Sequence, residues 1–190
     1  MKLIKERWMF PFSGSSIVKT MIYFDNAATT KPSKAAVDAM IKAAECFGNP
    51  SSLHGLGIEA EKLINESKKN IADMLGVESK NILFTSGGTE ANNLAVFGVA
   101  AARHKIGTKI VTSKIEHPSV LEAFRKLEID GFNVEYLDVD SEGRVDLDML
   151  RNVLDDETIL ISVMHVNNET GVIQPIEEIR EIMLEKAPYA

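Results

Sequence analysis

The chain has 190 residues, 45% of them hydrophobic and 26% charged, which is the composition of a soluble globular protein with one sizeable core. Its formal net charge of -7 arises without any basic run, so nucleic acid and anionic membrane surfaces are not favoured partners and a small molecule is expected instead. The single cysteine, Cys46, rules out an intrachain disulfide, and no apolar run approaches membrane-spanning length, which together predict a cytoplasmic protein.

Residues 1–20 show no sustained helical or strand period and contain a proline and a Ser/Gly cluster. A secretory signal would need a basic start followed by an apolar core of about 7 to 15 residues. Here the apolar run extends only from Trp8 to Phe12, and Pro11 interrupts it. We therefore expect a disordered leader or an extension from an upstream start codon, with a membrane-surface anchor as the weaker alternative.

From Met21 the chain runs through a short apolar stretch into small and hydroxyl residues, DNAATT. Pro32 is predicted at the first position of a helix, because its fixed φ suits that position. A second amphipathic helix is expected to end at Gly76. Between the two, GNPSSLHGLG is predicted to be rich in turns, with His54 as a loop or capping residue. Cys46, at the end of the first helix, is interpreted as a small apolar residue rather than a nucleophile.

The stretch from Asn81 to Asn93, NILFTSGGTEANN, predicts a strand, a glycine turn and the start of a helix. The first turn of a helix has backbone N–H groups without intrahelical partners, the helix dipole adds positive charge there, and glycines let an anion come close. Gly88 and Thr89 therefore indicate an anion site. Taken alone, the same residues also fit an ordinary strand-to-helix loop with a threonine cap.

Strand-like apolar runs alternate with segments of helical spacing over the rest of the chain. Parallel strands need such crossovers, and the nearly continuous apolar runs KIVTS and TILISVM indicate a sheet covered on both faces. We expect an α/β fold of three layers with a mainly parallel sheet. The strands are expected to begin at Ile82, Ile110, Val134 and Ile159, with helices over Ala91–Ala102, Val120–Leu127 and Leu147–Leu154, an Asp146 cap on the third helix and a last helix opened by Pro175.

Polar residues follow two of these strands where ligands bind in parallel sheets, at the carboxyl ends. His117 comes just after the strand at Ile110, and HVNNETG, with Asn167 and Asn168, follows the strand at Ile159. Each has a structural explanation, since His117 could cap a helix and either asparagine could shape a turn. Their convergence with Thr89 on one edge of the sheet predicts a ligand site.

Five motifs, in this order and spacing, carry a family resemblance: YFDNAATT, FGNPSSLHGLG, FTSGGTEANNLA, TSKIEHPSVL and MHVNNETGVIQPI. They resemble the N-terminal half of a cysteine desulfurase, a pyridoxal-phosphate enzyme of the aspartate-aminotransferase kind, fold type I. The match runs from Met21 to Ala190, which implies an N-terminal arm followed by the first half of the cofactor-binding domain, truncated. One departure is Thr170, where family members often carry isoleucine.

The resemblance implies a role for several residues. Gly88 and Thr89 would bind the phosphate of pyridoxal 5'-phosphate, and His117 would stack on its ring and assist proton transfer. Asn168 would donate to the phenolic oxygen of the cofactor or to the substrate. The residues of the arm expected on the substrate side are Ala28, Thr29 and Thr30, and no metal site is expected.

The activity implied is removal of sulfur from L-cysteine to give L-alanine and an enzyme persulfide, for iron-sulfur cluster or thio-cofactor assembly. The family implies a homodimer and a sulfur-acceptor or scaffold protein as partners. The cofactor-binding lysine, the nucleophilic cysteine and the carboxylate-binding arginine would all lie beyond Ala190, and Cys46 does not match the nucleophile loop.

Two other classes stay open. A related pyridoxal-phosphate enzyme, such as a selenocysteine lyase or an aminotransferase, would share these motifs. The other class is a non-catalytic fragment that binds a partner or has no activity. A P-loop NTPase is excluded, because no lysine follows the glycines of SGGTE. In the fold that the chain resembles, the strand at Ile82 pairs with strands outside this sequence, so we expect the chain alone to be poorly soluble or rearranged.

Overall fold

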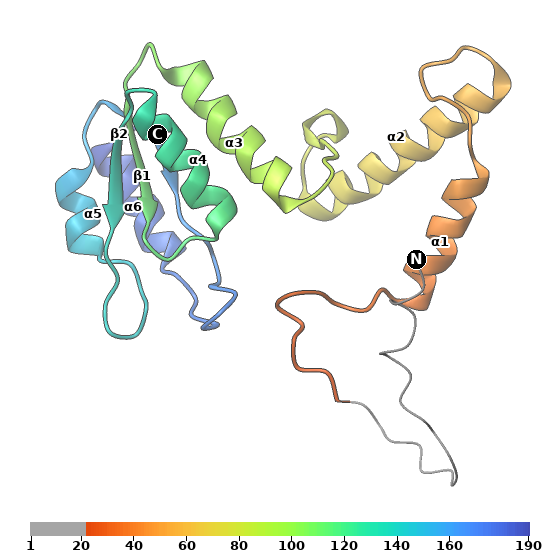
Figure 1. The fold of residues 1–190 in the computed structure, drawn as a ribbon. Helices are drawn as coiled ribbons and strands as arrows, with labels where there is room; N and C mark the ends of the chain where they lie inside the picture. The colour runs from red at the N-terminus through yellow and green to blue at the C-terminus, as the bar shows by residue number, and fades with distance from the viewer. Residues whose placement is uncertain (1–21) are drawn as a thin grey trace, which may run out of the picture. The chain divides into compact units, whose positions relative to one another are not determined.

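The computed structural model describes residues 22–190 and divides the chain into two compact units, one ending at Pro32 and one beginning at Ser33 (Figure 1). In the first unit, the described residues form a turn in which the N–H groups of Ala28 and Thr29 donate to the carbonyl oxygen of Asp25 at 3.3 and 3.4 Å. The predicted leader, residues 1–20, lies outside the described residues.

The second unit contains a parallel sheet of three strands, as the alternating pattern predicted. The strands are β1 (Lys109–Ser113), β2 (Asn133–Leu137) and β3 (Thr158–Ser162), in the order β2-β1-β3. Since β1 lies between the other two, the crossover from β1 to β2 joins neighbouring strands. The crossover from β2 to β3 passes over β1. The helices around the sheet are α3 (Gly88–Arg103), α4 (Pro118–Ile129), α5 (Leu147–Val153) and α6 (Ile176–Lys186).

Helices cover both faces of this sheet, which explains why consecutive residues of β1 and β3 are apolar (Figure 1). Ile110 of β1 packs with α3 and α4, in a core that also holds Phe124. The next residue, Val111, points to the other face and packs with α5 and α6. The predicted three-layer α/β architecture is therefore confirmed.

Most of the predicted helix starts are confirmed in detail. Asp146 caps α5, its Oδ1 accepting from the N–H of Met149 at 2.9 Å, and Pro118 occupies the first turn of α4. Pro175 is the residue before α6 rather than its first residue.

Two further helices, α1 (Lys34–Glu45) and α2 (Gly55–Leu75), precede the sheet in the sequence. The prediction for Pro32 was wrong, because the hydroxyl of Ser33 accepts from the N–H of Ala36 and makes Ser33 the cap, which leaves Pro32 outside the helix. Gly76 ends α2 in the left-handed conformation, with φ of 67°, as expected. Among residues 22–190, no helix is both long and apolar enough to cross a bilayer.

The loop between α1 and α2 folds back closely on the start of α2. A Cβ atom at Gly48 would lie 2.1 Å from the carbonyl oxygen of Leu56, and one at Gly57 would lie 2.2 Å from that of Ser52. His54 caps α2, its Nδ1 accepting from the N–H of Gly57 at 3.3 Å. The motif FGNPSSLHGLG therefore owes two of its glycines to close backbone contact.

The predicted strand at residues 81–85 was wrong. The structure has a short 3-10 helix there, η1 (Ser79–Asn81), followed by extended chain that joins no strand among residues 22–190. The backbone of Ile82 is extended, with φ of -92° and ψ of 120°, as the local sequence predicts. An extended segment becomes a strand only when a neighbour accepts its hydrogen bonds, and none of the three described strands does so.

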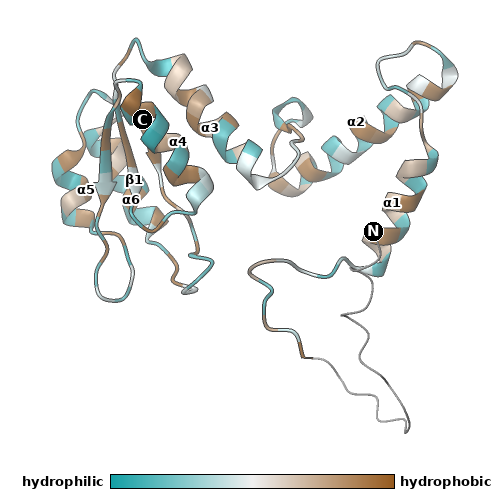
Figure 2. Cartoon of the chain, in the orientation of Figure 1, coloured by the Kyte–Doolittle hydropathy of each residue, from teal (hydrophilic) through white to brown (hydrophobic). Residues whose placement is uncertain are grey.

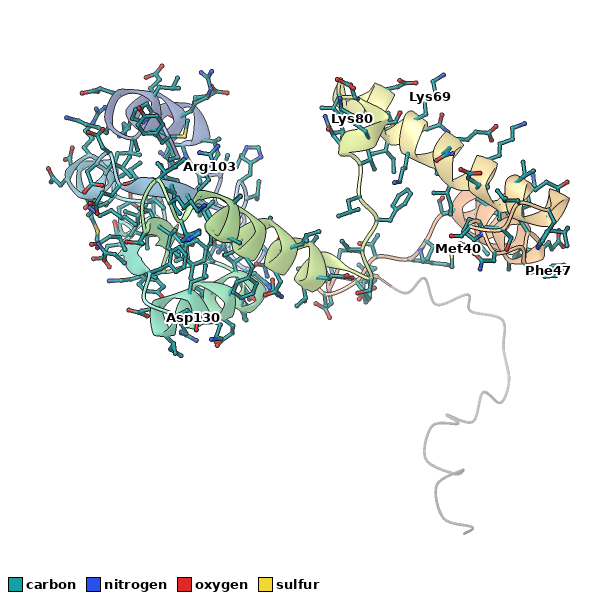
Figure 3. The ribbon with its side chains drawn as sticks, turned by 90° about the horizontal axis from the view of Figure 1, so that it is seen from above. Met40, Phe47, Lys69, Lys80, Arg103 and Asp130 are labelled. Carbon is teal, nitrogen blue, oxygen red and sulfur yellow. The ribbon has the colours of Figure 1, made fainter. Side chains whose placement is uncertain are left out.

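Apolar residues recur along α1 and α2 (Figure 2), and many are exposed. Met40 and Phe47, labelled in Figure 3, are 66% and 79% exposed. We call the whole group the exposed apolar set: Val37, Met40, Ile41, Phe47, Leu53, Leu56, Ile58, Leu63, Ile64, Ile71, Met74, Leu75, Val77, Leu83 and Phe84.

Candidate functional site

The start of α3 presents unpaired backbone donors. Gly87 is the residue before the helix, and the first turn closes with the N–H of Ala91 donating to the carbonyl oxygen of Gly87 at 3.1 Å. The N–H groups of Gly88, Thr89 and Glu90 have no acceptor among residues 22–190. A Cβ atom at Gly87 or Gly88 would meet nothing within 4 Å, so the space over these donors is open. This arrangement suits an anion.

Side chains shape the turn that leads into α3. The hydroxyl of Thr85 donates to the carbonyl oxygen of Gly87 at 3.1 Å, and the carboxylate of Glu90 accepts from the N–H of Ser86 at 2.6 Å. The side chain of Ser86, and then its N–H, lower the pKa of Glu90 by hydrogen bonds that stabilise the ionised carboxylate. The turn is therefore closed by its own side chains, and the donors of the first helical turn are left free.

His117 lies four residues after the end of β1 and caps α4 with an exposed ring. Its Nδ1 accepts from the N–H of Ser119 at 3.1 Å and lies 2.8 Å from the hydroxyl oxygen of Ser119. The predicted capping role of His117 is therefore present. Its Nε2 has no hydrogen-bond partner among the described residues and can face a ligand.

Packing between α3 and α4 brings Thr89 and His117 to one open hollow of about 490 Å³. Asn92, one turn after Thr89, ties the two helix starts together, since its Nδ2 donates to the hydroxyl of Ser119 at 2.8 Å. Gly88 is next to this hollow in sequence but is not among its lining residues. The lining consists of Thr89, Asn93, Phe97, His117, Pro118, Ser119, Glu122, Ala123 and Lys126.

The turn after β3 is tied to the loop after β1 by a buried asparagine. Asn167 is 6% exposed, and its Nδ2 donates to the carbonyl oxygen of Ile115 at 3.1 Å. Its Oδ1 accepts from the N–H groups of Glu169 and Thr170 at 3.0 and 2.9 Å. Gly171, with φ of 76°, closes the turn by donating to the carbonyl oxygen of Asn167 at 2.8 Å. Asn167 therefore shapes the turn, as its structural explanation predicted.

Asn168 is exposed, at the same carboxyl end of the sheet as His117. Its Nδ2 contacts only the carboxylate of Glu169, at 3.4 Å, and it does not line the hollow that holds Thr89 and His117. Its predicted role toward a cofactor or substrate stays a prediction. The same holds for Ala28, Thr29 and Thr30, which lie in the first unit of the chain.

A buried carboxylate beside His117 is the residue that sequence analysis missed. Glu116 is 7% exposed, and its Oε1 accepts from the hydroxyl of Ser113 at 2.9 Å and from the N–H of Met164 at 2.7 Å. It therefore joins the ends of β1 and β3. Burial raises the pKa of Glu116, against the effect of these two hydrogen bonds. No period or spacing marks a buried glutamate, so only its place within the motif TSKIEHPSVL could have drawn attention to it.

The raised pKa of Glu116 predicts a pH-dependent stability. Below the unfolded-state pKa of 4.5 the carboxyl is protonated in both states, and as pH rises toward the higher folded-state pKa the native state holds the extra proton and loses stability. Glu116→Gln keeps an acceptor oxygen without the charge, so it should remove this decline. We expect wild type to lose stability relative to the variant as the pH rises above about 4.5, measured by pulse proteolysis. Parallel curves would contradict the assignment.

The donor set fits a phosphate attached to an aromatic ring. Free N–H groups at the start of α3 and the hydroxyl of Thr89 suit the phosphate, and the imidazole of His117 across the hollow suits an aromatic ring. Among residues 22–190, no cluster of three or more His, Cys, Asp or Glu side chains could hold a metal ion.

Comparison with known proteins gives a family match over nearly the whole described chain. The family model described as aminotransferase class-V matches residues 22–187. A curated relative, the cysteine desulfurase IscS of Methanosarcina thermophila, is 50% identical over 169 residues, which are 88% of this chain and 42% of the relative. The chain spans less than half the length of this curated relative.

Solved structures give the same picture. A structure described as a NifS-like protein is 40% identical, with a TM-score of 0.85, and the match covers 89% of this chain and 47% of that one. Another, described as SspA in complex with cysteine, is 38% identical with a TM-score of 0.79, over 86% of this chain and 47% of that one. At these identities and scores the likeness extends beyond the sheet to the whole matched segment.

Proposed function

Because this chain belongs to the aminotransferase class-V family, we propose that it supplies the phosphate-binding and ring-binding half of a pyridoxal-phosphate-dependent cysteine desulfurase. The reaction removes sulfur from L-cysteine and gives L-alanine and an enzyme persulfide. The observation that carries the proposal is that the start of α3 and the imidazole of His117 share one hollow. In this proposal residues 21–190 are the N-terminal arm and the first half of the cofactor-binding domain.

The start of α3 binds the cofactor phosphate. The N–H groups of Gly88 and Thr89 donate to phosphate oxygens, the hydroxyl of Thr89 adds a further donor, and the helix dipole adds partial positive charge. The open space over Gly87 and Gly88 lets the phosphate reach the backbone. These contacts would hold the phosphate end of the cofactor, and His117 at the start of α4 would meet its ring.

His117 orients the ring and handles a proton. Its exposed imidazole would stack on the pyridine ring, and Nε2, which has no hydrogen-bond partner among the described residues, would be the atom that gives a proton and takes it back. Asn168 donates an amide hydrogen to the phenolic oxygen of the cofactor or to the substrate. When bound, pyridoxal phosphate serves as the electron sink for bond cleavage at the substrate.

The proposal includes partners and a compartment. The substrate is L-cysteine, which the solved relative described as SspA in complex with cysteine holds. The whole enzyme is a homodimer that passes its sulfur to an acceptor or scaffold protein for iron-sulfur cluster or thio-cofactor assembly. A chain with one cysteine fits the reducing cytoplasm. The arm residues Ala28 to Thr30 face the substrate.

The test supplies the half of the enzyme that the relatives have and this sequence does not. We would co-express the chain with the C-terminal part of the Methanosarcina thermophila relative, add pyridoxal phosphate and a thiol reductant that frees the persulfide sulfur as sulfide, and measure sulfide and alanine released from L-cysteine. We expect both products in equal amounts. Transamination without sulfide release would show that the enzyme is an aminotransferase and not a desulfurase. A soluble complex that does not bind the cofactor would show that the chain is a non-catalytic fragment.

His117→Ala in this complex is expected to lower kcat for sulfide release by about 100- to 10,000-fold, the usual effect of removing a positioned proton-transfer group. His104→Ala is the matched control, because His104 is also exposed but lies at the other end of α3. We expect that variant to retain wild-type kcat. An equal loss in both variants would remove His117 from the catalytic residues.

A further inference from the structure

The hydrogen bonds around His117 extend to a second helix. Nδ1 of His117 meets both the N–H and the hydroxyl of Ser119, at 3.1 and 2.8 Å. That hydroxyl accepts from Nδ2 of Asn92 at 2.8 Å. Asn92 and Ser119 are half-buried, and the chain Asn92–Ser119–His117 links the first turns of α3 and α4.

These contacts determine which nitrogen of the neutral ring carries the proton. A backbone N–H can only donate, so Nδ1 of His117 must present its lone pair to Ser119. The hydroxyl of Ser119 receives a hydrogen from Asn92 and therefore has its own hydrogen free to point at Nδ1. Both donors favour the same form of the ring, with the proton on Nε2.

We propose that Asn92 and Ser119 are positioning residues that hold the His117 ring in its Nε2–H form and tie it to the first turn of α3. The catalytic consequence rests on the proposed function: the helix start that binds the phosphate and the imidazole that meets the ring are kept at a constant separation. The tautomer itself follows from this chain alone.

Two of the other exposed histidines, His104 and His54, provide internal comparisons. His104 has its Nδ1 3.2 Å from the carbonyl oxygen of Ala101, an atom that can only accept, so Nδ1 carries the proton and the lone pair on Nε2 is free. His54 accepts at Nδ1 from the N–H of Gly57, but at 3.3 Å and without a hydroxyl contact. All three rings are exposed, so exposure alone predicts equal reactivity.

Acylation by diethyl pyrocarbonate separates these cases, because a ring nitrogen with a free lone pair attacks a carbonyl carbon of the reagent. In the full chain at low micromolar concentration and without cofactor, the rate at each histidine is read by peptide mass spectrometry. Among His54, His104 and His117, we expect His104 to react fastest and His117 slowest. Ser119→Ala should accelerate His117 by about 2- to 12-fold, the equivalent of one hydrogen bond, and leave His104 unchanged.

Two further variants separate positioning from general loosening of the fold. Ser119→Thr restores the hydroxyl and should restore slow acylation of His117. Asn92→Ala should accelerate His117, whereas Asn152→Ala should not, because Asn152 is an exposed residue of α5 and does not line the hollow. An unchanged His117 rate in Ser119→Ala, or fast acylation in Ser119→Thr, would overturn the proposal.

A cofactor experiment tests the catalytic consequence separately. In the co-expressed complex, Ser119→Ala and Asn92→Ala should each weaken the affinity for pyridoxal phosphate by about 2- to 12-fold. The affinity of the double variant should be no lower than that of the single variant with the lower affinity, because both substitutions remove the same link. Losses of binding free energy that add up in the double variant would contradict this link. If the wild-type complex does not bind pyridoxal phosphate, the proposed function fails while the acylation result still decides the tautomer.

Discussion

Expressed by itself, the 190-residue chain is expected to self-associate and to lose residues 22–87 to a protease before residues 88–187. The physical reason is the exposed apolar set on α1, α2 and the extended segment after η1, which includes Phe84 at 51% exposure. Exposed apolar surface next to unpaired backbone donors and acceptors favours association with another chain. Residues 88–187, by contrast, bury two cores on the two faces of their sheet.

Light scattering and limited proteolysis check this expectation. Co-expression with the C-terminal part of the Methanosarcina thermophila relative should give a soluble complex in which residues 22–87 resist the protease. Leu83→Lys with Phe84→Lys should reduce self-association of the chain alone, whereas a matched pair at exposed polar positions, Glu59→Lys with Glu66→Lys, should not. A monodisperse monomer with a cooperative thermal transition would contradict the prediction.

Phe124→Ala is expected to destabilise residues 88–187 by about 3 to 5 kcal/mol, because it removes the largest fully buried side chain of the core between the sheet and helices α3 and α4. Hydrogen exchange of the β1 amides, followed by mass spectrometry, measures the loss. In Phe124→Ala the exchange rate of these amides should rise by about 100- to 5,000-fold where exchange requires full opening of the sheet.

Phe47→Ala is the matched control for Phe124→Ala. The same side chain is removed, but Phe47 is 79% exposed, and exposed substitutions change stability by less than about 0.5 kcal/mol. The β1 amides should therefore exchange at the wild-type rate. Similar exchange rates in the two variants would show that Phe124 is not part of a packed core.

The regular part of the fold was predictable because its signals are local. The runs at Ile110, Val134 and Ile159 became β1, β2 and β3, and the spacing of apolar residues between them gave α4 and α5 close to their observed ends. Apolar periodicity and capping residues act within a few positions of the sequence, so a single chain reveals them. The error at residues 81–85 has the opposite cause, since pairing depends on a neighbour that the local sequence does not specify.

The candidate site shows the same division. A glycine turn and a histidine after a strand could be recognised along the sequence, and the five motifs identified the family. However, Thr89 and His117 line the same hollow because α3 packs against α4, and not because a strand at Ile82 brings them there. The hydrogen bond from Met164 to Glu116 and the link from Asn92 to Ser119 join residues 48 and 27 positions apart, beyond the reach of any periodic pattern.

The sequence by itself determined the layered α/β architecture, the family and several helix ends, such as those at Asp146 and Gly76, because each depends on residue type and short spacing. The tertiary structure alone decided which polar side chains meet. It placed Thr89 and His117 at one hollow, kept Asn168 out of that hollow, and buried Glu116 between two strand ends. The reason is that such contacts follow from how helices pack on the sheet, which depends on many side chains together.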